Sequence, residues 1–198
     1  MTRFYLLRHG ETDWNRDGNR YCGRTDIGLS EEGQRQIHNT ALRLKEVSFD
    51  AIYSSTLQRA VLSAQALQTH HKLDITRDER LVEIDFGQWE GWKGAQISER
   101  DPQGWKLWIT EPELYPAGGS GETAGQVADR AASFFAEISK RHEGGCVAVV
   151  AHNTLFRIYL ARMLEMPMRN YRNLSKDNTG ISIIELQAEQ FRLIQLNG

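Results

Sequence analysis

The sequence predicts an α/β fold of three layers, in which a mostly parallel central sheet carries helices on both faces. Two observations favour this fold. Short apolar segments alternate along the chain with longer segments in which apolar residues recur every three or four positions, as expected for alternating strands and helices. In addition, residues 146–151 (CVAVVA) form a continuous apolar run, which is typical of a strand covered on both faces of a parallel sheet.

The first half of the chain predicts three strands and two helices. The strands are expected at residues 3–7, 51–53 and 80–84, with helices after Ser30 and over residues 57–67. Ser30 is expected to cap the first helix, because its hydroxyl can accept a hydrogen bond from the first turn and two glutamates follow it. Gly33 in that helix is unfavourable by about 1 kcal/mol relative to alanine.

The second half predicts two further helices and three strands. Residues 87–121 have a weaker pattern, contain four tryptophans and end in a glycine-rich stretch that is expected to be a flexible loop. The remaining elements are a long helix around residues 127–138, the strand at 146–151, a helix over 154–163 and two closing strands at 181–186 and 191–196.

Polar residues follow the predicted strands at the positions where such a fold places its ligands. Ligands of open α/β sheets bind beyond the carboxyl ends of the strands. Arg8 and His9 follow the first strand, Arg59 follows the second, Glu83 lies near the end of the third, and His152 follows the 146–151 strand. These residues, which are distant in sequence, are therefore expected to meet at one edge of the sheet.

Two histidines, two arginines and a glutamate at one edge suggest phosphoryl transfer. The planar guanidinium groups of Arg8 and Arg59 match the oxygens of a phosphate monoester, which carries a charge of roughly −1.5 to −2 at pH 7. A neutral imidazole is a competent nucleophile toward phosphorus, and Glu83 could protonate the leaving oxygen and then activate a water. Because these residues supply positive charge themselves, the site is expected to need no metal and no cofactor.

Several segments of the sequence resemble one protein family. They are, in chain order, LLRHGETDWN, GRTDIGLSEEG, YSSTLQRAVLSA, LVEIDFGQWEG, SGET and VVAHNTLFR. Together they cover nearly the whole chain and resemble the histidine phosphatase superfamily, the phosphoglycerate mutase-like proteins, in its phosphatase branch. The segments EIDFGQWEG, WITEP and DNTGIS are similar to the bacterial phosphoserine phosphatases of this fold.

The resemblance implies a role for each site residue. It implies that His9 becomes phosphorylated, that Glu83 is the proton donor, and that Arg8, Arg59 and His152 hold the phosphoryl group. Asn15 and the backbone N–H of Asn153 match further phosphate contacts, and Gly23, Arg24 and Thr25 lie in a loop that contacts substrate in the family. The chain departs from the family at Asn153 and Thr154, where glycines are common, and this departure suggests an altered choice of substrate.

Alternatives to these assignments come from neighbouring residues. Asp85 competes with Glu83 for the role of the acid, because in a strand the two would share a face. Ser55 follows a strand but lacks the G-x-S-x-G pattern of a nucleophilic serine. The other histidines (His38, His70, His71 and His142) fit exposed positions and have no metal-ligand spacing.

The length of the chain predicts a single domain over residues 1–198, and the resemblance implies a cap over the active site at about 87–121. Trp92, Trp105 or Trp108 of this segment is expected to shape the pocket for the leaving group. The expected function is hydrolysis of a small phosphorylated metabolite. The alternatives are a phosphoglycerate mutase, a phosphatase of phosphorylated proteins, and a binding module without catalysis. His152 follows Glu83 by only 69 positions, which leaves little room for the longer insertion of the mutases.

Composition and charge exclude other classes of function. The net charge of −2 gives no support for binding nucleic acid or membranes through bulk electrostatics, and no apolar run reaches the roughly 18 residues of a membrane span. With two cysteines there is no disulfide framework. The first residues lack the pattern of a signal peptide, so a cytoplasmic protein is expected. A homodimer formed through the last strand is possible.

Overall fold

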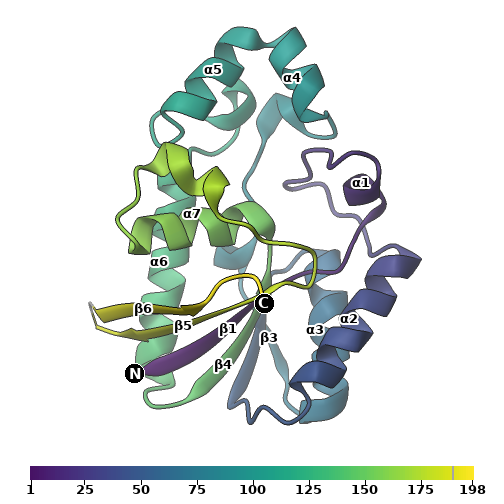
Figure 1. Cartoon of the computed structure of the whole chain (residues 1–198), viewed down its shortest axis with the longest axis vertical. Helices are drawn as coiled ribbons and strands as arrows, with labels where there is room; N and C mark the ends of the chain where they lie inside the picture. Colours follow the sequence, from purple (N-terminus) through teal and green to yellow (C-terminus); the bar gives the residue numbers. More distant parts are fainter. Residues whose placement is uncertain (189) are drawn as a thin grey trace.

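The fold is built on a six-stranded sheet whose middle strands are parallel (Figure 1). A computed structural model of the chain describes residues 1–188 and 190–198. The strands are β1 (Thr2–Arg8), β2 (Ala51–Ser54), β3 (Ile75–Arg77), β4 (Cys146–Ala151), β5 (Ile181–Gln187) and β6 (Gln190–Gln195). Their order is β3-β2-β4-β1-β5-β6; the first four strands of this order pair in parallel, and β5 runs antiparallel to both β1 and β6. The prediction of a mostly parallel sheet is confirmed.

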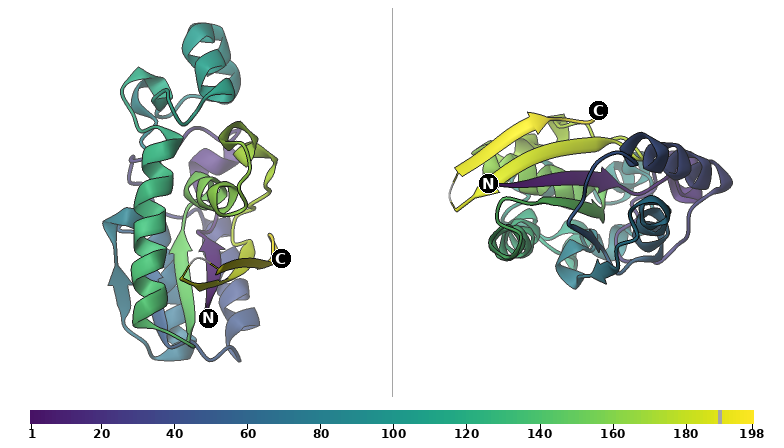
Figure 2. Two further views of the ribbon diagram at one scale, coloured as in Figure 1. Left: turned by 90° about the vertical axis from the view of Figure 1, so that its left-hand side faces the viewer. Right: turned by 90° about the horizontal axis from the view of Figure 1, so that it is seen from below.

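Helices cover both faces of this sheet (Figure 2). Val147 and Val149 of β4 pack with α6 (Ala124–Arg141) and α7 (Asn153–Met163), whereas Ala148 and Val150 pack with α2 (Glu31–Leu44) and α3 (Gln58–His71). Successive side chains of a strand point to opposite faces, so a strand covered on both sides must be apolar throughout. This accounts for the CVAVVA run and confirms the three-layer prediction.

The start of α2 explains the unfavourable glycine of that helix. Ser30 caps the helix as predicted, and its hydroxyl accepts a hydrogen bond from the Gly33 N–H at 3.0 Å. A Cβ at Gly33 would overlap the backbone of Glu11, and a Cβ at Gly10 would overlap the Gly33 carbonyl. The first turn of α2 therefore lies directly against the segment that follows β1, and glycine at both positions permits this close approach.

The strand predicted at residues 80–84 is wrong. The third strand of the sheet is β3, and the chain turns away from the sheet in the 3₁₀ turn η1 (Glu79–Leu81). Asp78 stabilises this turn, because its carboxylate accepts hydrogen bonds from the Arg80 N–H at 2.8 Å and from the Arg80 guanidinium. Glu83 therefore lies on an irregular segment that crosses to the start of α7, not at a strand end.

The segment with four tryptophans folds into short helical pieces at one end of the molecule, the upper tip in Figure 1. These pieces are η2 (Gly87–Trp89), α4 (Gly94–Arg100), α5 (Pro102–Thr110) and η3 (Ala117–Gly119). Trp89 and Trp108 are fully buried, and the Trp89 indole N–H donates to Asp101 at 3.1 Å. In the glycine-rich stretch, Gly118 adopts a positive φ of 57° and lies against the backbone of residues 86–89.

The other short elements complete the chain. They are α1 (Asp13–Arg16) and the 3₁₀ segment η4 (Met168–Asn173), both of which lie between the sheet and the upper tip in Figure 1. The strand β6 forms the edge of the sheet, where Ile194 is half exposed. Within residues 1–188 and 190–198, no helix combines the length and the apolar character needed to cross a bilayer.

Candidate active site

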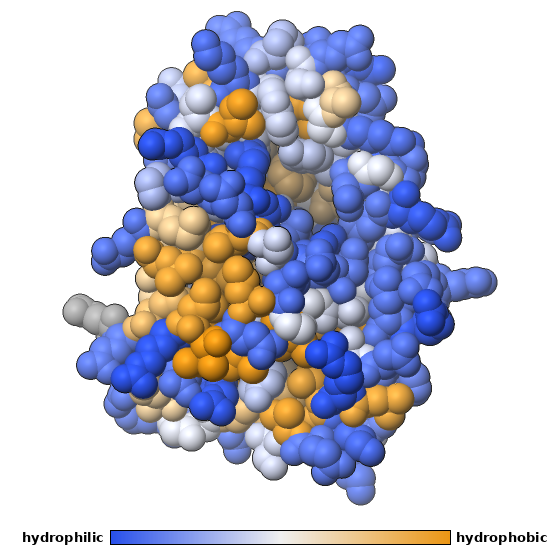
Figure 3. Space-filling model, in the orientation of Figure 1, coloured by the Kyte–Doolittle hydropathy of each residue, from blue (hydrophilic) through white to orange (hydrophobic). Residues whose placement is uncertain are grey.

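The pairing of β1 with β4 brings two histidines together. Arg8 lies opposite Ala151 in the parallel register, so the next residues, His9 and His152, leave the sheet side by side, and the His9 N–H donates to the Ala151 carbonyl at 3.1 Å. The two imidazole rings lie 5.3 Å apart between their centroids, and both are buried. His9 lines a cavity of about 550 Å³, which appears in Figure 3 as a hollow below the upper tip.

His9 is held as a neutral imidazole with one free nitrogen. Its Nδ1 lies 2.7 Å from the Gly10 carbonyl oxygen, which can only accept, so Nδ1 carries the proton and Nε2 has a free lone pair. Burial, together with the positive charges of Arg59 and Arg8, holds the pKa of His9 well below its usual value of 6.5. At neutral pH the Nε2 of His9 is therefore available as a nucleophile.

Ser55 orients the second histidine. The Ser55 hydroxyl lies 2.8 Å from His152 Nε2 and accepts a hydrogen bond from the Leu57 N–H, so its own proton is free to donate to His152. The His152 proton then resides on Nδ1, a buried atom with no hydrogen-bond partner among the described residues. The Ser55 hydroxyl is thus engaged on one side by His152 and on the other by the Leu57 N–H.

Arg8 is fixed by a backbone carbonyl. Its Nη1 donates to the Lys176 carbonyl at 2.8 Å, while the ammonium group of Lys176 donates to the Leu6 and Gly180 carbonyls at 2.7 Å each. Burial lowers the pKa of Arg8 to about 10, so the guanidinium stays charged at neutral pH. Its Nε is buried and has no partner among the described residues, which leaves a donor available for an anion.

Arg59 and the loop of Gly23, Arg24 and Thr25 hold each other in place. Arg59 is 1% exposed, and its terminal nitrogens donate to the Thr25 and Gly23 carbonyls at 2.9 and 2.8 Å. On the other side of the loop, the Glu90 carboxylate accepts from the Gly23 and Arg24 N–H groups and from the Thr25 hydroxyl. Of the three guanidinium nitrogens of Arg59, Nε alone has no partner in the described part of the chain. The loop carbonyls therefore orient this arginine and leave its Nε as a donor.

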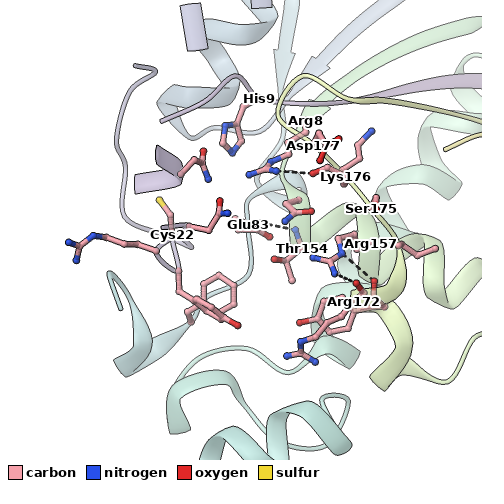
Figure 4. Close-up of a pocket in the computed structure, with 18 of the residues that line it drawn as sticks. Arg8, His9, Cys22, Glu83, Thr154, Arg157, Arg172, Ser175, Lys176 and Asp177 are labelled. Atoms are coloured by element: carbon pink, nitrogen blue, oxygen red, sulfur yellow. Dashed lines mark hydrogen bonds between the residues drawn. The ribbon is translucent and has the colours of Figure 1, made fainter. Parts of the chain in front are cut away.

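Glu83 lies at the start of α7 and accepts three backbone hydrogen bonds. Its Oε1 accepts from the N–H groups of Ile84 and Leu155 at 2.9 Å each. Its Oε2 accepts from the Thr154 N–H at 2.9 Å (Figure 4). The first N–H groups of a helix have no partner within the helix, so they favour a carboxylate at this point. Oε2 accepts only one of these hydrogen bonds, so it keeps an acceptor position for a ligand.

The two asparagines expected at the site also line the cavity. Asn15 Oδ1 accepts from the N–H and hydroxyl of Thr12 and from the Asn178 amide, which leaves the Asn15 amide N–H₂ free for a ligand. Asn153 is the first residue of α7, and its Oδ1 is buried without a partner among the described residues. Thr154 also lines the cavity, so both departures from the family pattern face the space that a substrate would fill.

The predicted site residues divide into two groups. Arg8, His9, Asn15, Glu83 and Asn153 line the cavity, whereas Gly23, Arg24, Thr25, Arg59 and His152 lie behind or beside its wall. The rival acid Asp85 is not part of the lining, because its carboxylate accepts from the Gly87 N–H at 2.8 Å. No group of three or more histidine, cysteine or acidic side chains suited to a metal occurs among residues 1–188 and 190–198.

Sequence reasoning missed several cationic and aromatic residues of the lining. The main ones are Tyr21, Arg157, Tyr171, Arg172 and Lys176. Arg157 was detectable, because it follows Asn153 by one helical turn and therefore faces the same way. Arg172 comes from the 3₁₀ segment η4 and has no local signal. Of the tryptophans expected to shape the pocket, Trp105 lines the cavity, while Trp108 belongs to the buried core.

Comparisons with known proteins agree with this geometry. The family model for the histidine phosphatase superfamily (branch 1) matches residues 4–198. The chain belongs to this superfamily. Among curated members, phosphoserine phosphatase 1 of Hydrogenobacter thermophilus is 32% identical over the whole chain and 92% of its own length. A probable phosphoglycerate mutase of Salmonella choleraesuis is 29% identical over 96% of the chain and 88% of its own length.

Solved structures of histidine phosphatases have the same fold. Phosphoserine phosphatase of Entamoeba histolytica, in complex with 3-phosphoglyceric acid, superimposes with a TM-score of 0.91 at 29% identity and covers the whole chain and 98% of its own. The expected family, fold and phosphatase chemistry are thereby confirmed for this histidine phosphatase.

Proposed function

We propose that this histidine phosphatase releases phosphate from small phosphorylated metabolites through a phosphohistidine on His9. The observation that carries the proposal is a set of buried nitrogen atoms without partners beside the free His9 Nε2, namely Arg8 Nε, Arg59 Nε and His152 Nδ1. A buried donor without an acceptor is costly, so such donors indicate a missing ligand with acceptor oxygens. A phosphoryl group supplies these oxygens and the negative charge that both arginines require.

In the first step, His9 Nε2 forms a bond to phosphorus and the bond from phosphorus to the leaving oxygen breaks. The electron pair of that bond goes to the oxygen, which takes the proton from Glu83 Oε2. Arg8, Arg59 and His152 bind the oxygens of the phosphoryl group while charge moves across it. Asn15 and the Asn153 N–H complete this set of donors.

In the second step, water replaces the leaving group beside Glu83. The carboxylate takes a proton from the water as its oxygen bonds to phosphorus, and the bond to His9 breaks, returning the electron pair to Nε2. Inorganic phosphate leaves, and Glu83 and His9 are back in their starting forms. The chain supplies every group that this cycle needs.

The segment of residues 87–121 serves in this proposal as a cap within a single domain. It contributes Trp105 to the lining of the cavity, next to Phe86 immediately before the segment, and it forms the tip above the hollow in Figure 3. A cavity of about 550 Å³ that is covered in this way suits a metabolite, whereas a phosphorylated protein needs an open surface.

A mutase is the second candidate, because one curated relative carries that name. A mutase must keep water from its phosphohistidine and return the phosphoryl group to a bound product. Of the short helices α4 and α5, only Trp105 contributes to the lining of this cavity, so the segment of residues 87–121 covers little of it. This limited cover favours hydrolysis.

Phosphate release from 3-phosphoglycerate and O-phosphoserine tests the proposal. His9→Ala is expected to lower kcat/KM at least about 1,000-fold, because the nucleophile is lost. His38→Ala, a change on the exposed face of α2, is the matched control and is expected to keep full activity. Equal phosphate release by wild type and His9→Ala would overturn the mechanism, and isomerisation of phosphoglycerates with little free phosphate would identify a mutase.

A further inference from the structure

A second cationic group lies in the cavity away from His9. The guanidinium carbon of Arg172 lies 4.6 Å from the ring centroid of Tyr171 and 5.7 and 5.6 Å from those of Trp105 and Trp108. Stacking on aromatic faces stabilises the charge and fixes the plane of the group. Both terminal nitrogens of Arg172 are buried; the Tyr21 hydroxyl lies close to the guanidinium, but no hydrogen bond of good geometry reaches these nitrogens among the described residues. The guanidinium is therefore oriented but not satisfied.

Arg157 reinforces this charge. Its Nε donates to the Tyr171 carbonyl at 3.2 Å, another nitrogen donates to the Arg172 carbonyl, and its guanidinium carbon lies 5.4 Å from the same Tyr171 ring. Burial and the charge of Arg172 lower the pKa of Arg157. Two like charges are thus held close together in a partly desolvated place, which is unfavourable unless an anion lies between them or beside them.

The position of these arginines relates them to the leaving group. In Figure 4, Arg157 and Arg172 lie on the far side of Glu83 and Thr154 from His9. A phosphoryl group at His9 with its leaving oxygen at Glu83 would direct the rest of the substrate toward them. Five basic side chains line the cavity, but the Lys176 Nζ already donates to the Leu6 and Gly180 carbonyls and burial holds the pKa of Lys176 well below 10.5, so the positive charge available to a substrate lies on arginines.

Arg20, another of the five, provides a contrast. Its guanidinium is fully engaged by the Asp17 carboxylate and the Gly91 carbonyl. Arg172 has no acidic partner of this kind within residues 1–188 and 190–198. The unmet hydrogen-bonding capacity at this end of the cavity is therefore concentrated on Arg172.

We propose that Arg172, supported by Arg157, binds a carboxylate on the leaving group, so that the preferred substrates are phosphomonoesters of small hydroxy or amino acids. This inference rests on the proposed function. A carboxylate is planar, and its two oxygens can accept two parallel hydrogen bonds from the terminal nitrogens of Arg172. Arg172 is then a specificity residue, and its effect depends on the leaving group and not on the phosphoryl transfer.

Two phosphomonoesters that differ only in the carboxylate test this role. The pair is 3-phosphoglycerate and glycerol 3-phosphate, in which a hydroxymethyl group replaces the carboxylate. Wild type is expected to prefer 3-phosphoglycerate about 10- to 100-fold in kcat/KM, because this factor corresponds to the free energy that hydrogen bonds to a charged group contribute. Arg172→Gln is expected to lose that factor on 3-phosphoglycerate and to stay within about threefold of wild type on glycerol 3-phosphate.

Arg169→Gln is the matched control, because Arg169 lies on the same segment η4 but is exposed and outside the cavity lining. It is expected to keep the wild-type preference. If Arg172→Gln does not fold, Arg172→Lys keeps a charge at the position and is expected to retain only part of the preference, since lysine cannot make the parallel pair of hydrogen bonds.

Three results would overturn the proposal: no preference in wild type, an equal loss on both substrates in Arg172→Gln, or a stronger preference for a bisphosphate than for 3-phosphoglycerate. Calorimetric binding of the same two compounds to His9→Ala separates this proposal from the proposed function. The carboxylate site would be supported if His9→Ala bound 3-phosphoglycerate more tightly than glycerol 3-phosphate and if adding Arg172→Gln to this variant abolished the difference. This result would hold even if His9→Ala still hydrolysed both compounds.

Discussion

The two ends of the cavity are held in different ways. At the phosphate end, backbone groups fix the reactive side chains: the Gly10 carbonyl holds His9, and three N–H groups hold Glu83. At the leaving-group end, Arg172 is fixed by stacking on aromatic side chains such as Trp105, which come from segments outside the sheet.

This difference separates chemistry from specificity. Backbone positions follow from the pairing of β1 with β4 and from the start of α7, so they persist when side chains elsewhere change. Stacked side chains can be exchanged without disturbing the sheet. We therefore expect changes at the phosphate end to affect all substrates, and changes at the leaving-group end to affect substrates selectively.

Glu83→Gln gives the largest expected effect, because Glu83 joins the two ends. The glutamine cannot protonate the leaving oxygen, so kcat on alkyl phosphates is expected to fall about 100- to 10,000-fold. With 4-nitrophenyl phosphate, whose leaving group needs no proton, the first step is expected to slow about tenfold or less. Single-turnover phosphorylation of the enzyme measures this step.

Asp85→Asn is the control for this change. The asparagine oxygen can still accept from the Gly87 N–H, so the local turn is kept and activity is expected to stay near wild type. A comparable loss of activity in Asp85→Asn, or an equal loss on both types of substrate in Glu83→Gln, would show that Glu83 is not the acid.

Ser55→Ala gives the next largest effect and tests the phosphate end alone. Removing the hydroxyl leaves the buried Nε2 of His152 without a partner, so the Ser55 contact no longer determines which ring nitrogen of His152 carries the proton. We expect kcat/KM to fall about 5- to 100-fold on every substrate, with the pH profile altered because the state of His152 is no longer fixed.

Two other serine variants sharpen this test. Ser55→Thr keeps a hydroxyl and is expected to recover part of the activity. Ser54→Ala alters a neighbouring buried serine whose hydroxyl donates to the Ser55 carbonyl and not to His152, so it is expected to keep the wild-type pH profile. A loss in Ser55→Ala that depends on the leaving group would contradict the separation of the two ends.

The phosphate end could largely be predicted from the sequence, and for a physical reason. His9 and His152 immediately follow strands that pair in parallel, so their meeting follows from the fold class. Arg59 was placed correctly as a residue that follows β2, although its carbonyl partners at Gly23 and Thr25 were not foreseeable. The strand assigned around Glu83 was wrong, because the local Asp78–Arg80 pair ends the sheet earlier than apolar periodicity suggests.

The leaving-group end could not be predicted in the same way. Arg172 and Trp105 are 67 positions apart and lie on short irregular or helical pieces that have no strand register to relate them. Their contact depends on how the 87–121 segment packs on η4, which is a tertiary property without a sequence period. The tryptophans were recognised as candidates for the pocket, but only the packing distinguishes Trp105 from the buried Trp108.

Acid is expected to destabilise the protein through the phosphate end. Burial holds the pKa values of His9 and His152 well below 6.5, so below pH 6.5 the unfolded chain binds protons that the folded protein does not. The free energy of unfolding therefore falls as pH decreases below 6.5, by up to about 1.4 kcal/mol per pH unit for each histidine.

Urea unfolding between pH 5 and 7 measures this dependence. His9→Asn is expected to reduce the slope of the free energy of unfolding against pH by the contribution of one histidine. His38→Asn, on the exposed face of α2, is the control and is expected to leave this slope closer to that of wild type. Carboxylates that titrate nearby contribute equally to all three proteins and cancel in the comparison. An unchanged slope in His9→Asn would mean that His9 is protonated in the folded state.

Trp105→Leu gives the smallest expected effect and tests the leaving-group end alone. Leucine keeps apolar volume but removes one of the aromatic faces on which Arg172 stacks, a contact typically worth about 0.5–1 kcal/mol. We expect KM for 3-phosphoglycerate to rise about two- to fivefold while kcat/KM for glycerol 3-phosphate stays near wild type. Trp92→Leu is the control, because Trp92 stacks with Arg100 outside the cavity lining. If Trp105→Leu weakened both substrates equally, Trp105 would act on the shape of the whole cavity, and the two ends would not be independent.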